Sequence, residues 1–445
     1  MQVLKFGGTS IGSAEAIKRT ANIISGIDDK TIIVLSAFSG ITNLLSQINS
    51  FLLFGQLEKA NLVAEEIQER HQDIISNLFT NDDYKNQAVK ILNKHLNTLT
   101  DQFHESLLDF HPNEILAVGE LLSSQIILAY FKELKLDVSL INALDYMRLN
   151  RNNEPDQSIT KDLLGNLINN CSDQIIITQG YICRNHEGTI DNLKRGGSDY
   201  TAAIIGAATN ASAIQIWTDI DGLHNNDPRF VNNTEPIASI SFEEAAELAY
   251  FGAKVLHPQS ILPAKEANIP VLLKNTFEPS KAGTLIQRQI FNEGVRAIAA
   301  KDGITSIKIK SYRMLMSYGF LKNVFEVFEK YQTPIDVITT SEVAVSLTID
   351  ETEHLEKIID QLQVFGEVTL ENELSIISVV GYFPSDQVGF GAQIMTALAE
   401  IPIRMISYGG SLHNISLIVK NDDKVRALNN LQTHIFQKEV NLQIA

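Results

Sequence analysis

Short runs of β-branched and aliphatic residues alternate with helical patterns through the first two-thirds of the chain. Runs of this kind occupy residues 31–38, 137–144, 174–182, 213–220 and 269–275. Strands that a parallel sheet buries on both faces have this near-continuous apolar composition, and helices connect them. The pattern therefore predicts an α/β fold with a mostly parallel sheet sandwiched by helices. Such sheets bind their ligands beyond the carboxyl ends of the strands.

The rest of the chain departs from this alternation in two places. Residues 51 to about 110 read as long amphipathic helices, which predicts a helical insertion with solvated histidines at His71, His95 and His104. Towards the C-terminus a strand, helix, strand, strand pattern occurs twice, as expected for two small α+β modules in tandem. The predicted domains are a catalytic domain (1–295) that includes the insertion, a first module (300–370) and a second module (371–445), with interleaved modules allowed.

The formal net charge of −17 at pH 7 bounds the kinds of partner that this chain can attract. No global positive field exists to gather phosphates, so we expect neither nucleic acid nor a membrane surface as a partner. No apolar run reaches the roughly 18 residues of a membrane span. Cys171 and Cys183 lack the spacing of metal ligands. We expect a cytoplasmic protein whose own side chains form no metal site.

The first candidate ligand site is the stretch KFGGTS near the N-terminus. Residues 3–6 read as a strand and 14–24 as a helix, so Gly7 and Gly8 lie in a strand-to-helix turn. Glycines let the backbone approach a ligand closely, and amides at a helix start suit a phosphate, to which Lys5 would add a positive charge. The alternative is a plain tight turn beside a solvated lysine.

A second Gly-Gly turn, LKRGGSDYTA, precedes a helix that we expect to begin near Tyr200. Arg195 beside these glycines suits bidentate capture of a carboxylate or phosphate, whereas Ser198 or Asp199 could simply cap the helix. The loop WTDIDGLHNNDPR fails the EF-hand spacing and suits the rim of a purine pocket, with Arg229 for phosphate. Further candidates are Ser36 and Thr42, which lie in a strand-to-helix turn, and Lys254, which lies at a helix end. Glu120 lies near a helix start, where it could merely compensate the helix dipole. Gly-rich turns together with four cationic side chains are suited to phosphoryl transfer, which needs positioning and charge neutralisation. These side chains are Lys5, Arg195, Arg229 and Lys254.

These motifs resemble those of the aspartate kinases of the amino-acid kinase superfamily. KFGGTS, SGITNLL, GE, KRGGSDYTA, TDIDGLHNNDPR and GAKVLHP occur in that family's order and spacing, and the two C-terminal modules resemble its paired ACT domains. The resemblance implies the amino-acid kinase fold followed by two ferredoxin-like modules. It also implies transfer of the γ-phosphoryl group of ATP, with Mg²⁺ on the nucleotide, to the side chain of L-aspartate. The product would be 4-phospho-L-aspartate, on the pathway to lysine, threonine and methionine.

The resemblance implies roles for single residues as well. The catalytic residues would be Lys5, Asp199 and Lys254, with Asp199 orienting the two lysines. L-Aspartate would contact Ser36, Thr42, Glu120, Arg195, Ser198 and Asp199, with Arg195 on its α-carboxylate and Glu120 on its ammonium group. ATP would contact Lys5, Gly7, Gly8, Thr218, Asp219, His224, Arg229 and Lys254. The sequence departs from the family at Lys194, where glycine is usual, and at His224, where tyrosine is common.

The C-terminal modules of this family sense amino acids, and the segment MLMSYGFL…PIDVITTSE most resembles its lysine-sensitive, monofunctional members. L-Lysine is therefore the expected inhibitor. The expected effector contacts are Met314, Ser317, Gly319, Phe320, Leu321, Asp336, Val337, Ser341 and Glu342, although Asp336 could instead be a solvated strand-end residue. Open strand edges in the modules predict a homodimer or a tetramer. Two alternatives stay open, namely a sister kinase acting on glutamate, acetylglutamate or UMP, and a non-catalytic amino-acid sensor.

Overall fold

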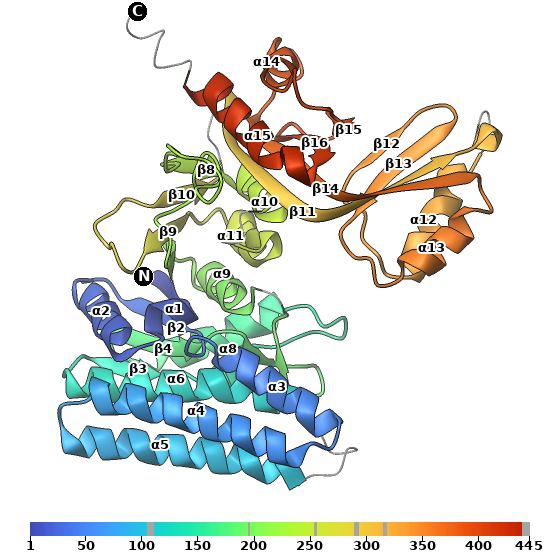
Figure 1. Ribbon diagram of the computed structural model, residues 1–445. Helices are drawn as coiled ribbons and strands as arrows, with labels where there is room; N and C mark the ends of the chain where they lie inside the picture. Colours follow the sequence, from blue (N-terminus) through green and yellow to red (C-terminus); the bar gives the residue numbers. More distant parts are fainter. Residues whose placement is uncertain (105–110, 195, 253–255, 289–292, 315–317, 438–445) are drawn as a thin grey trace, which may run out of the picture. The chain divides into compact units, whose positions relative to one another are not determined.

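The chain forms two compact units (Figure 1). A computed structural model describes residues 1–104, 111–194, 196–252, 256–288, 293–314 and 318–437. The first unit comprises 1–223, 238–242 and 256–289, and the second comprises 224–237, 243–255 and 290–445. Segments 224–237 and 243–255 thus group with the second unit, although they precede the limit at residue 295 that we predict for the catalytic domain. The predicted limits of the catalytic domain and of the two modules stay predictions.

An eight-stranded sheet forms the centre of the first unit, in the order β3-β4-β2-β1-β7-β9-β10-β8. Its strands are β1 (Gln2–Phe6), β2 (Thr31–Leu35), β3 (Val138–Leu140), β4 (Ile175–Gln179), β7 (Ile214–Thr218), β8 (Ser239–Ser241), β9 (Val271–Asn275) and β10 (Thr284–Gln287). Every neighbouring pair is parallel except β9 with β10. The predicted mostly parallel sheet is confirmed, and each of the five apolar runs contains one strand. The sequence pattern missed β8 and β10, which lie outside the five apolar runs.

Helices cover this sheet. They are α1 (Gly8–Ile11), α2 (Ala14–Ser25), α3 (Ile41–Leu53), α4 (Leu57–Leu78), α5 (Asp82–Asp101), α6 (Pro112–Glu133), α7 (Ala143–Tyr146), α8 (Gln157–Asn169), α9 (Gly197–Thr209) and α11 (Leu262–Glu266), with 3-10 turns η1 (Gln102–His104) and η2 (Pro258–Ile261) and a small hairpin of β5 (Ile182–Arg184) and β6 (Ile190–Asn192). Ser13 caps α2 by accepting a hydrogen bond from the amide of Ala16 at 3.2 Å, as a helix start predicts.

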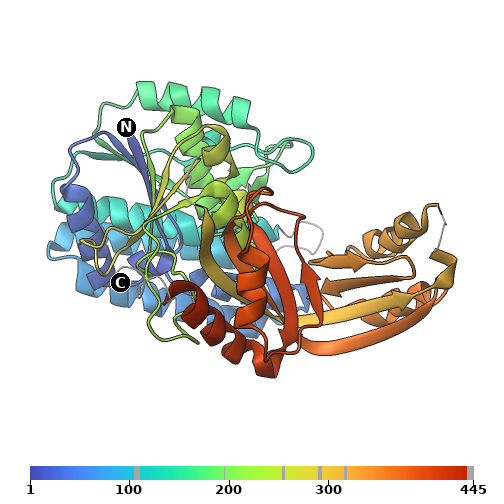
Figure 2. The same ribbon diagram turned by 90° about the horizontal axis from the view of Figure 1, so that it is seen from above.

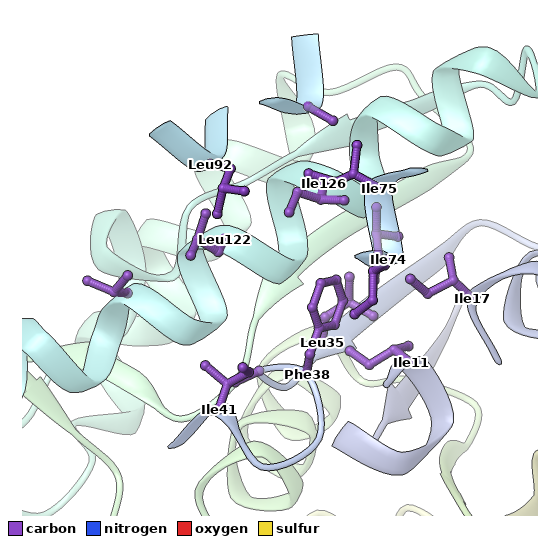
Figure 3. Close-up of a cluster of buried hydrophobic side chains, with 14 of the residues drawn as sticks. Ile11, Ile17, Leu35, Phe38, Ile41, Ile74, Ile75, Leu92, Leu122 and Ile126 are labelled. Carbon is purple, nitrogen blue, oxygen red and sulfur yellow. The ribbon is translucent and has the colours of Figure 1, made fainter. Parts of the chain in front are cut away.

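The core of the first unit lies between the sheet and the helical insertion. Leu35 and Phe38, at the end of β2, pack with Ile74 of α4 and Ile126 of α6 in one apolar cluster (Figure 3). Helices α4, α5 and α6 lie side by side below the sheet in Figure 1, and α4 also packs against α2 and α3. The insertion therefore supports the turn after β2, which belongs to the candidate site. Its helical character is confirmed.

Helix α6 runs through this core. It is the one helix of the described residues that is long and apolar enough to cross a membrane, judged by length and composition. However, 72% of its apolar window is buried inside the unit, and the helix packs against β2, β3 and β4. The apolar composition of α6 thus matches its burial within the protein.

His71 of α4 is buried, and our expectation that it is solvated is wrong. Its side chain has no exposed surface, and Nδ1 donates to the carbonyl oxygen of Ile67 at 2.7 Å. The ring lies 5.2 Å from the ring of Phe38. Burial lowers the pKa of His71 from 6.5 to about 4. The polar sequence around it was misleading because α4 has helices on more than one side. His95 is half-buried with a lowered pKa, mainly through burial, and the side chain of His104 lies outside the described residues.

Replacing His71 with leucine should make the first unit less sensitive to acid. A histidine that is neutral in the fold and charged in the unfolded chain destabilises the fold as pH falls from 6.5 through 4. The wild type should lose up to about 3 kcal/mol of unfolding free energy over that range from this residue alone. Denaturant unfolding of both proteins at pH 7, 5.5 and 4 measures the difference. Parallel losses in the two proteins would contradict this role for His71.

A six-stranded antiparallel sheet forms the centre of the second unit, in the order β12-β13-β11-β14-β16-β15. Its elements are β11 (Gly294–Lys310), η3 (Tyr312–Met314), α12 (Phe320–Lys330), β12 (Ile338–Thr340), β13 (Ala344–Ile349), α13 (Leu355–Leu362), β14 (Glu367–Tyr382), α14 (Phe390–Ala397), β15 (Met405–Ser407), β16 (Asn414–Lys420), α15 (Asn421–Leu431) and the π-helical turn η4 (Gln432–Phe436), and most of α10 (Phe242–Tyr250) joins them. The predicted strand, helix, strand, strand pattern is present twice.

The two modules share their longest strands. Figures 1 and 2 show β11 and β14 paired along the unit. One apolar core contains Ile307 and Val345, and the other contains Val379, Leu417 and Ile298 from the beginning of β11. Each core therefore draws on the same pair of strands, because β11 has one half in each.

Candidate active site

The first glycine turn brings Lys5 against Asp199. Lys5 lies in β1, and its Nζ is 2.7 Å from Oδ1 of Asp199, with both side chains largely buried. A Cβ atom added at Gly7 would lie 3.3 Å from that Nζ, so the glycine leaves room for the ammonium group. Gly8 begins the short helix α1 and passes close to the backbone of Ala37. Lys5 is therefore paired and not solvated, which contradicts that part of the alternative, whereas the phosphate-binding role of the turn stays a prediction.

The second glycine turn leads directly into α9. This helix begins at Gly197, three residues before the predicted start, and its N-cap is Gly196, whose φ of 75° favours glycine. Ser198 and Asp199 therefore lie within the first turn, and the alternative that one of them is the cap is wrong. In that position the Asp199 side chain is available to Lys5. Arg195, the residue before this cap, lies outside the described residues.

A pocket of about 510 Å³ lies beside this helix start within the first unit. Its walls are Ser36, Thr42, Glu120, Tyr181, Lys194, Gly196, Gly197 and Ser198. Four of the predicted substrate residues, Ser36, Thr42, Glu120 and Ser198, are thus brought together from the turn after β2 and from α3, α6 and α9. Lys194, which stands where the family usually has glycine, also lines this pocket and is exposed.

Glu120 is the buried acidic residue of this pocket. It lies in the interior of α6, so the expectation of a helix-start residue that compensates the dipole is wrong. Its side chain is 3% exposed, Oε1 accepts from the amide of Ala37 at 3.2 Å, and Oε2 has no hydrogen-bond partner among the described residues. Burial raises the pKa of Glu120 from 4.5 to about 8, against the opposing hydrogen bond from Ala37. Such a group is suited to receive a cation.

Tyr181 is a pocket residue that the sequence reasoning missed. It follows Gly180 at the end of β4 and has a φ of 67°, which is rare for a bulky residue. Its amide donates to Oγ1 of Thr201 at 3.0 Å, and burial, followed by the charge of Glu120, raises its pKa to about 12. Its position at the carboxyl end of a strand run was the available signal. The left-handed backbone was not readable from the sequence.

Predicted nucleotide residues fall in both units. In the first unit, a pocket of about 380 Å³ beside α1 is lined by Thr9, Gly12, Ser13, Glu15, Ala16, Arg19, Ser39, Asp219 and Phe277. Thr218 ends β7 and donates to Oδ1 of Asp219 at 3.1 Å. Asp219 therefore lies at a pocket next to α1, and its role toward phosphates stays a prediction. Thr9, Arg19 and Ser39 were not among the predicted contacts.

The other nucleotide residues belong to the second unit or lie outside the described part. His224 pairs through Nδ1 with Oγ1 of Thr234 at 2.9 Å. Arg229 is exposed and donates to both oxygens of Asp227, from Nη2 at 2.6 Å and from Nε at 2.9 Å. Lys254 lies outside the described residues. The roles of these residues toward ATP stay predictions.

The predicted effector residues lie in the first module of the second unit. Phe320 is buried and stacks edge-on against Phe365, and Met314 and Leu321 pack on the same core. Gly319 is the left-handed N-cap of α12. Val337 is buried, Ser341 and Glu342 are exposed, and Ser317 lies outside the described residues. Asp336 is buried and ion-paired with Lys301, so the alternative of a solvated strand-end residue is wrong.

The parallel sheet, the glycine turns and the paired Lys5 define a kinase-type site on an α/β unit that an antiparallel unit follows. Residues 1–275 match the amino acid kinase family, and residues 377–435 match an ACT domain. Lysine-sensitive aspartokinase 3 of Escherichia coli K12 is 33% identical over 455 residues, which cover 98% of this chain and 99% of that protein.

Two solved structures of E. coli aspartokinase III are similar over 98% of this chain. One is the R-state in complex with aspartate and ADP, with a TM-score of 0.85, 33% identity and 100% of that chain covered. The other is the T-state in complex with lysine and aspartate, with a TM-score of 0.82, 32% identity and 99% covered. The chain therefore belongs to the aspartokinases of the amino-acid kinase family, and it is an aspartate kinase.

Proposed function

We propose that this chain transfers the γ-phosphoryl group of ATP to the side-chain carboxylate of L-aspartate, forming 4-phospho-L-aspartate on the pathway to lysine, threonine and methionine. The observation that carries the proposal is the Lys5–Asp199 pair, because Asp199 directly follows Ser198 of the pocket that contains Glu120. The related E. coli enzyme in complex with aspartate and ADP supports the choice of substrates.

The reaction needs charge neutralisation and no general base. The side-chain carboxylate of aspartate, with a pKa near 3.9, is already ionised at neutral pH, so the barrier includes repulsion between two anions. Lys5, held by Asp199, provides a fixed positive charge next to the amides of the glycine turn. Lys254 would provide a second such charge by its resemblance to the family. Positioning and electrostatics of this kind account for most of the catalysis in phosphoryl transfer.

Recognition of L-aspartate rests on its ammonium group. Glu120 has one buried oxygen without a hydrogen-bond partner among the described residues, and this oxygen could accept from a cation that enters the pocket. Thr42 and Ser198, which also line the pocket, would donate hydrogen bonds to the substrate. Arg195 would bind the α-carboxylate with its two-pronged guanidinium group. A substrate without an ammonium group would leave Glu120 buried and unpaired.

ATP would enter with Mg²⁺. This cation is commonly held by one or two carboxylates together with substrate phosphates. Asp219, which lines the pocket beside α1, would supply one such carboxylate together with the phosphates of ATP. Bound Mg²⁺ would neutralise phosphate charge. Thr218, His224 and Arg229 are the further contacts that we propose for the nucleotide.

We also propose that L-lysine inhibits the enzyme through the first module, and that the protein acts in the cytoplasm as a homodimer or a tetramer. Support for lysine comes from the lysine-sensitive relative and from the T-state complex with lysine and aspartate. Support for oligomerisation comes from β12 and β15, which form the two edges of the six-stranded sheet.

A coupled assay of ADP release should show Mg²⁺-dependent ATP turnover that requires L-aspartate. Glutamate, acetylglutamate and UMP are the comparison substrates, and each should give less than a tenth of the aspartate rate. The same assay with millimolar L-lysine, L-threonine or L-methionine tests the effector. Equal ADP release with and without aspartate would overturn the proposed reaction. Inhibition by threonine or methionine alone would overturn the effector assignment only.

A further inference from the structure

Asp336, one of the residues proposed for the effector, is held inside the second unit by its own chain. Its side chain is 1% exposed, and Oδ1 accepts from Nζ of Lys301 at 2.7 Å and from the hydroxyl of Tyr250 at 2.9 Å. Its other oxygen, Oδ2, is buried without a hydrogen-bond partner among the described residues. The carboxylate is thus paired but keeps one acceptor for a further donor.

The ammonium group of Lys301 occupies a complete cation site. It contacts Asp336 at 2.7 Å and Oδ2 of Asp350 at 2.8 Å, and it lies 4.7 Å from the centre of the Tyr250 ring. Two carboxylates and an aromatic face satisfy an ammonium ion through charge, hydrogen bonds and cation–π attraction. These contacts, acting against the effect of burial, raise the pKa of Lys301, so the group is charged at neutral pH.

Backbone hydrogen bonds fix this site in place. The amide of Asp336 donates to the carbonyl oxygen of Thr348 at 2.9 Å, and the amide of Val337 donates to its Oγ1 at 3.0 Å. Asp350 directly follows β13, and Lys301 lies on the neighbouring strand β11. The two carboxylates therefore cannot separate easily if the ammonium group leaves. Two adjacent carboxylates without a cation would be strongly disfavoured.

We infer that Lys301 is a built-in competitor for the ammonium group of a cationic effector. The inference rests on the proposed regulation by L-lysine. In the state described here, the site formed by Asp336, Asp350 and Tyr250 is filled by the chain's own lysine. A free amino acid gains this site only by displacing Lys301, and in our inference the competing cation is the ammonium group of its side chain. Lys301 thus sets both the effector concentration that is needed and the preference for a cationic side chain.

The same exchange would be transmitted to α10. Tyr250 is the last residue of this helix and shares the Oδ1 atom of Asp336 with Lys301. An arriving ammonium group that repositions Asp336 must therefore change the hydrogen bond of Tyr250. Displacement of Lys301 would therefore change a contact at the end of α10 within the second unit.

Lys301→Met should bind L-lysine at least tenfold more tightly than the wild type in isothermal titration calorimetry. Methionine removes the charge and keeps much of the side-chain length. Lys308→Met is the matched control, since Lys308 is exposed on the same strand, and it should bind as the wild type does. L-Norleucine, which lacks the side-chain ammonium group of lysine but keeps the α-ammonium group, should gain no affinity for Lys301→Met. Lys301→Gln, which can still donate to the carboxylates, serves as a second variant if Lys301→Met does not fold.

Unchanged or weaker lysine binding by the Lys301 variants, relative to the wild type and to Lys308→Met, would overturn the inference. An equal gain for L-norleucine would also overturn it, because charge would then have no part. Separate measurements, namely the aspartate-dependent activity and the lysine inhibition of the wild type, decide the proposed function, so the two failures can be told apart. If lysine does not inhibit the wild type but Lys301→Met binds it tightly, the assignment of lysine as the effector is wrong. The competition between Lys301 and a free ammonium group would then still stand.

Discussion

Replacing Lys5 with methionine should lower kcat by about 10³-fold, a loss comparable to that of removing a strong transition-state donor. The KM values for ATP and aspartate should change far less. Lys5 is largely buried, lies 2.7 Å from Asp199 and is adjacent to the glycine turn, so its charge is fixed in place before the substrates bind. Such a charge matters most when the phosphoryl group is between donor and acceptor.

Steady-state kinetics with both substrates varied separates these effects. Lys161→Met, at an exposed position on α8, is the matched control and should retain the wild-type constants. Asp199→Asn should lie between the two, since it loosens the lysine without removing its charge. A Lys5 variant with unchanged kcat and a large increase in the KM for ATP would mean that Lys5 only binds the nucleotide.

Replacing Glu120 with glutamine should raise the KM for aspartate by about 10²-fold, as expected for the loss of a buried charged hydrogen bond. The wild-type Glu120 must give up its proton to receive an ammonium group, and its pKa in the free protein is about 8. The KM for aspartate should therefore fall as pH rises from 6 towards 8 in the wild type and change less in Glu120→Gln. Glu114→Gln, in the first turn of the same helix, is the control. Equal KM values for the wild type and Glu120→Gln would remove Glu120 from the substrate site.

The same substitution has an effect of opposite sign on stability. A carboxyl group whose pKa rises from 4.5 to about 8 on folding binds its proton more tightly in the folded state. As pH rises from 4.5 to about 8, the unfolding free energy of the wild type should therefore fall, by at most about 1.4 kcal/mol per pH unit from this group. Glu120→Gln should lack this loss and be the more stable protein at pH 8. Substrate recognition thus has a cost in stability at this residue.

The strands and the glycine turns could be predicted because their signals are local. A run of β-branched residues such as 175–179 predicts a buried strand by itself, and the Gly7-Gly8 turn lies between two readable elements. The family resemblance could be recognised for the same reason, because it rests on short motifs in a fixed order along the chain. β8 was missed because its three residues lie in no apolar run and form a strand by pairing with β10.

Burial and pairing could not be read from the local sequence. His71 lies in a polar stretch, yet its helix packs against other helices. Glu120 looked like a helix-start residue because the beginning of α6 is not marked by a capping side chain. The φ of Tyr181 and the ion pair of Asp336 depend on contacts with other elements in the same way.

The sequence by itself determined the strand pattern, the positions of the phosphate-type turns and the family, because these depend on residue types at short spacing. Only the tertiary structure decided which of the candidate residues share a site and in which charge state. Lys5 of β1 pairs with Asp199 of α9. Glu120 accepts a hydrogen bond from the amide of Ala37, which is 83 positions away in the sequence. Desolvation and Coulomb energy depend on distances in space, which the fold sets and the spacing of residues along the chain does not.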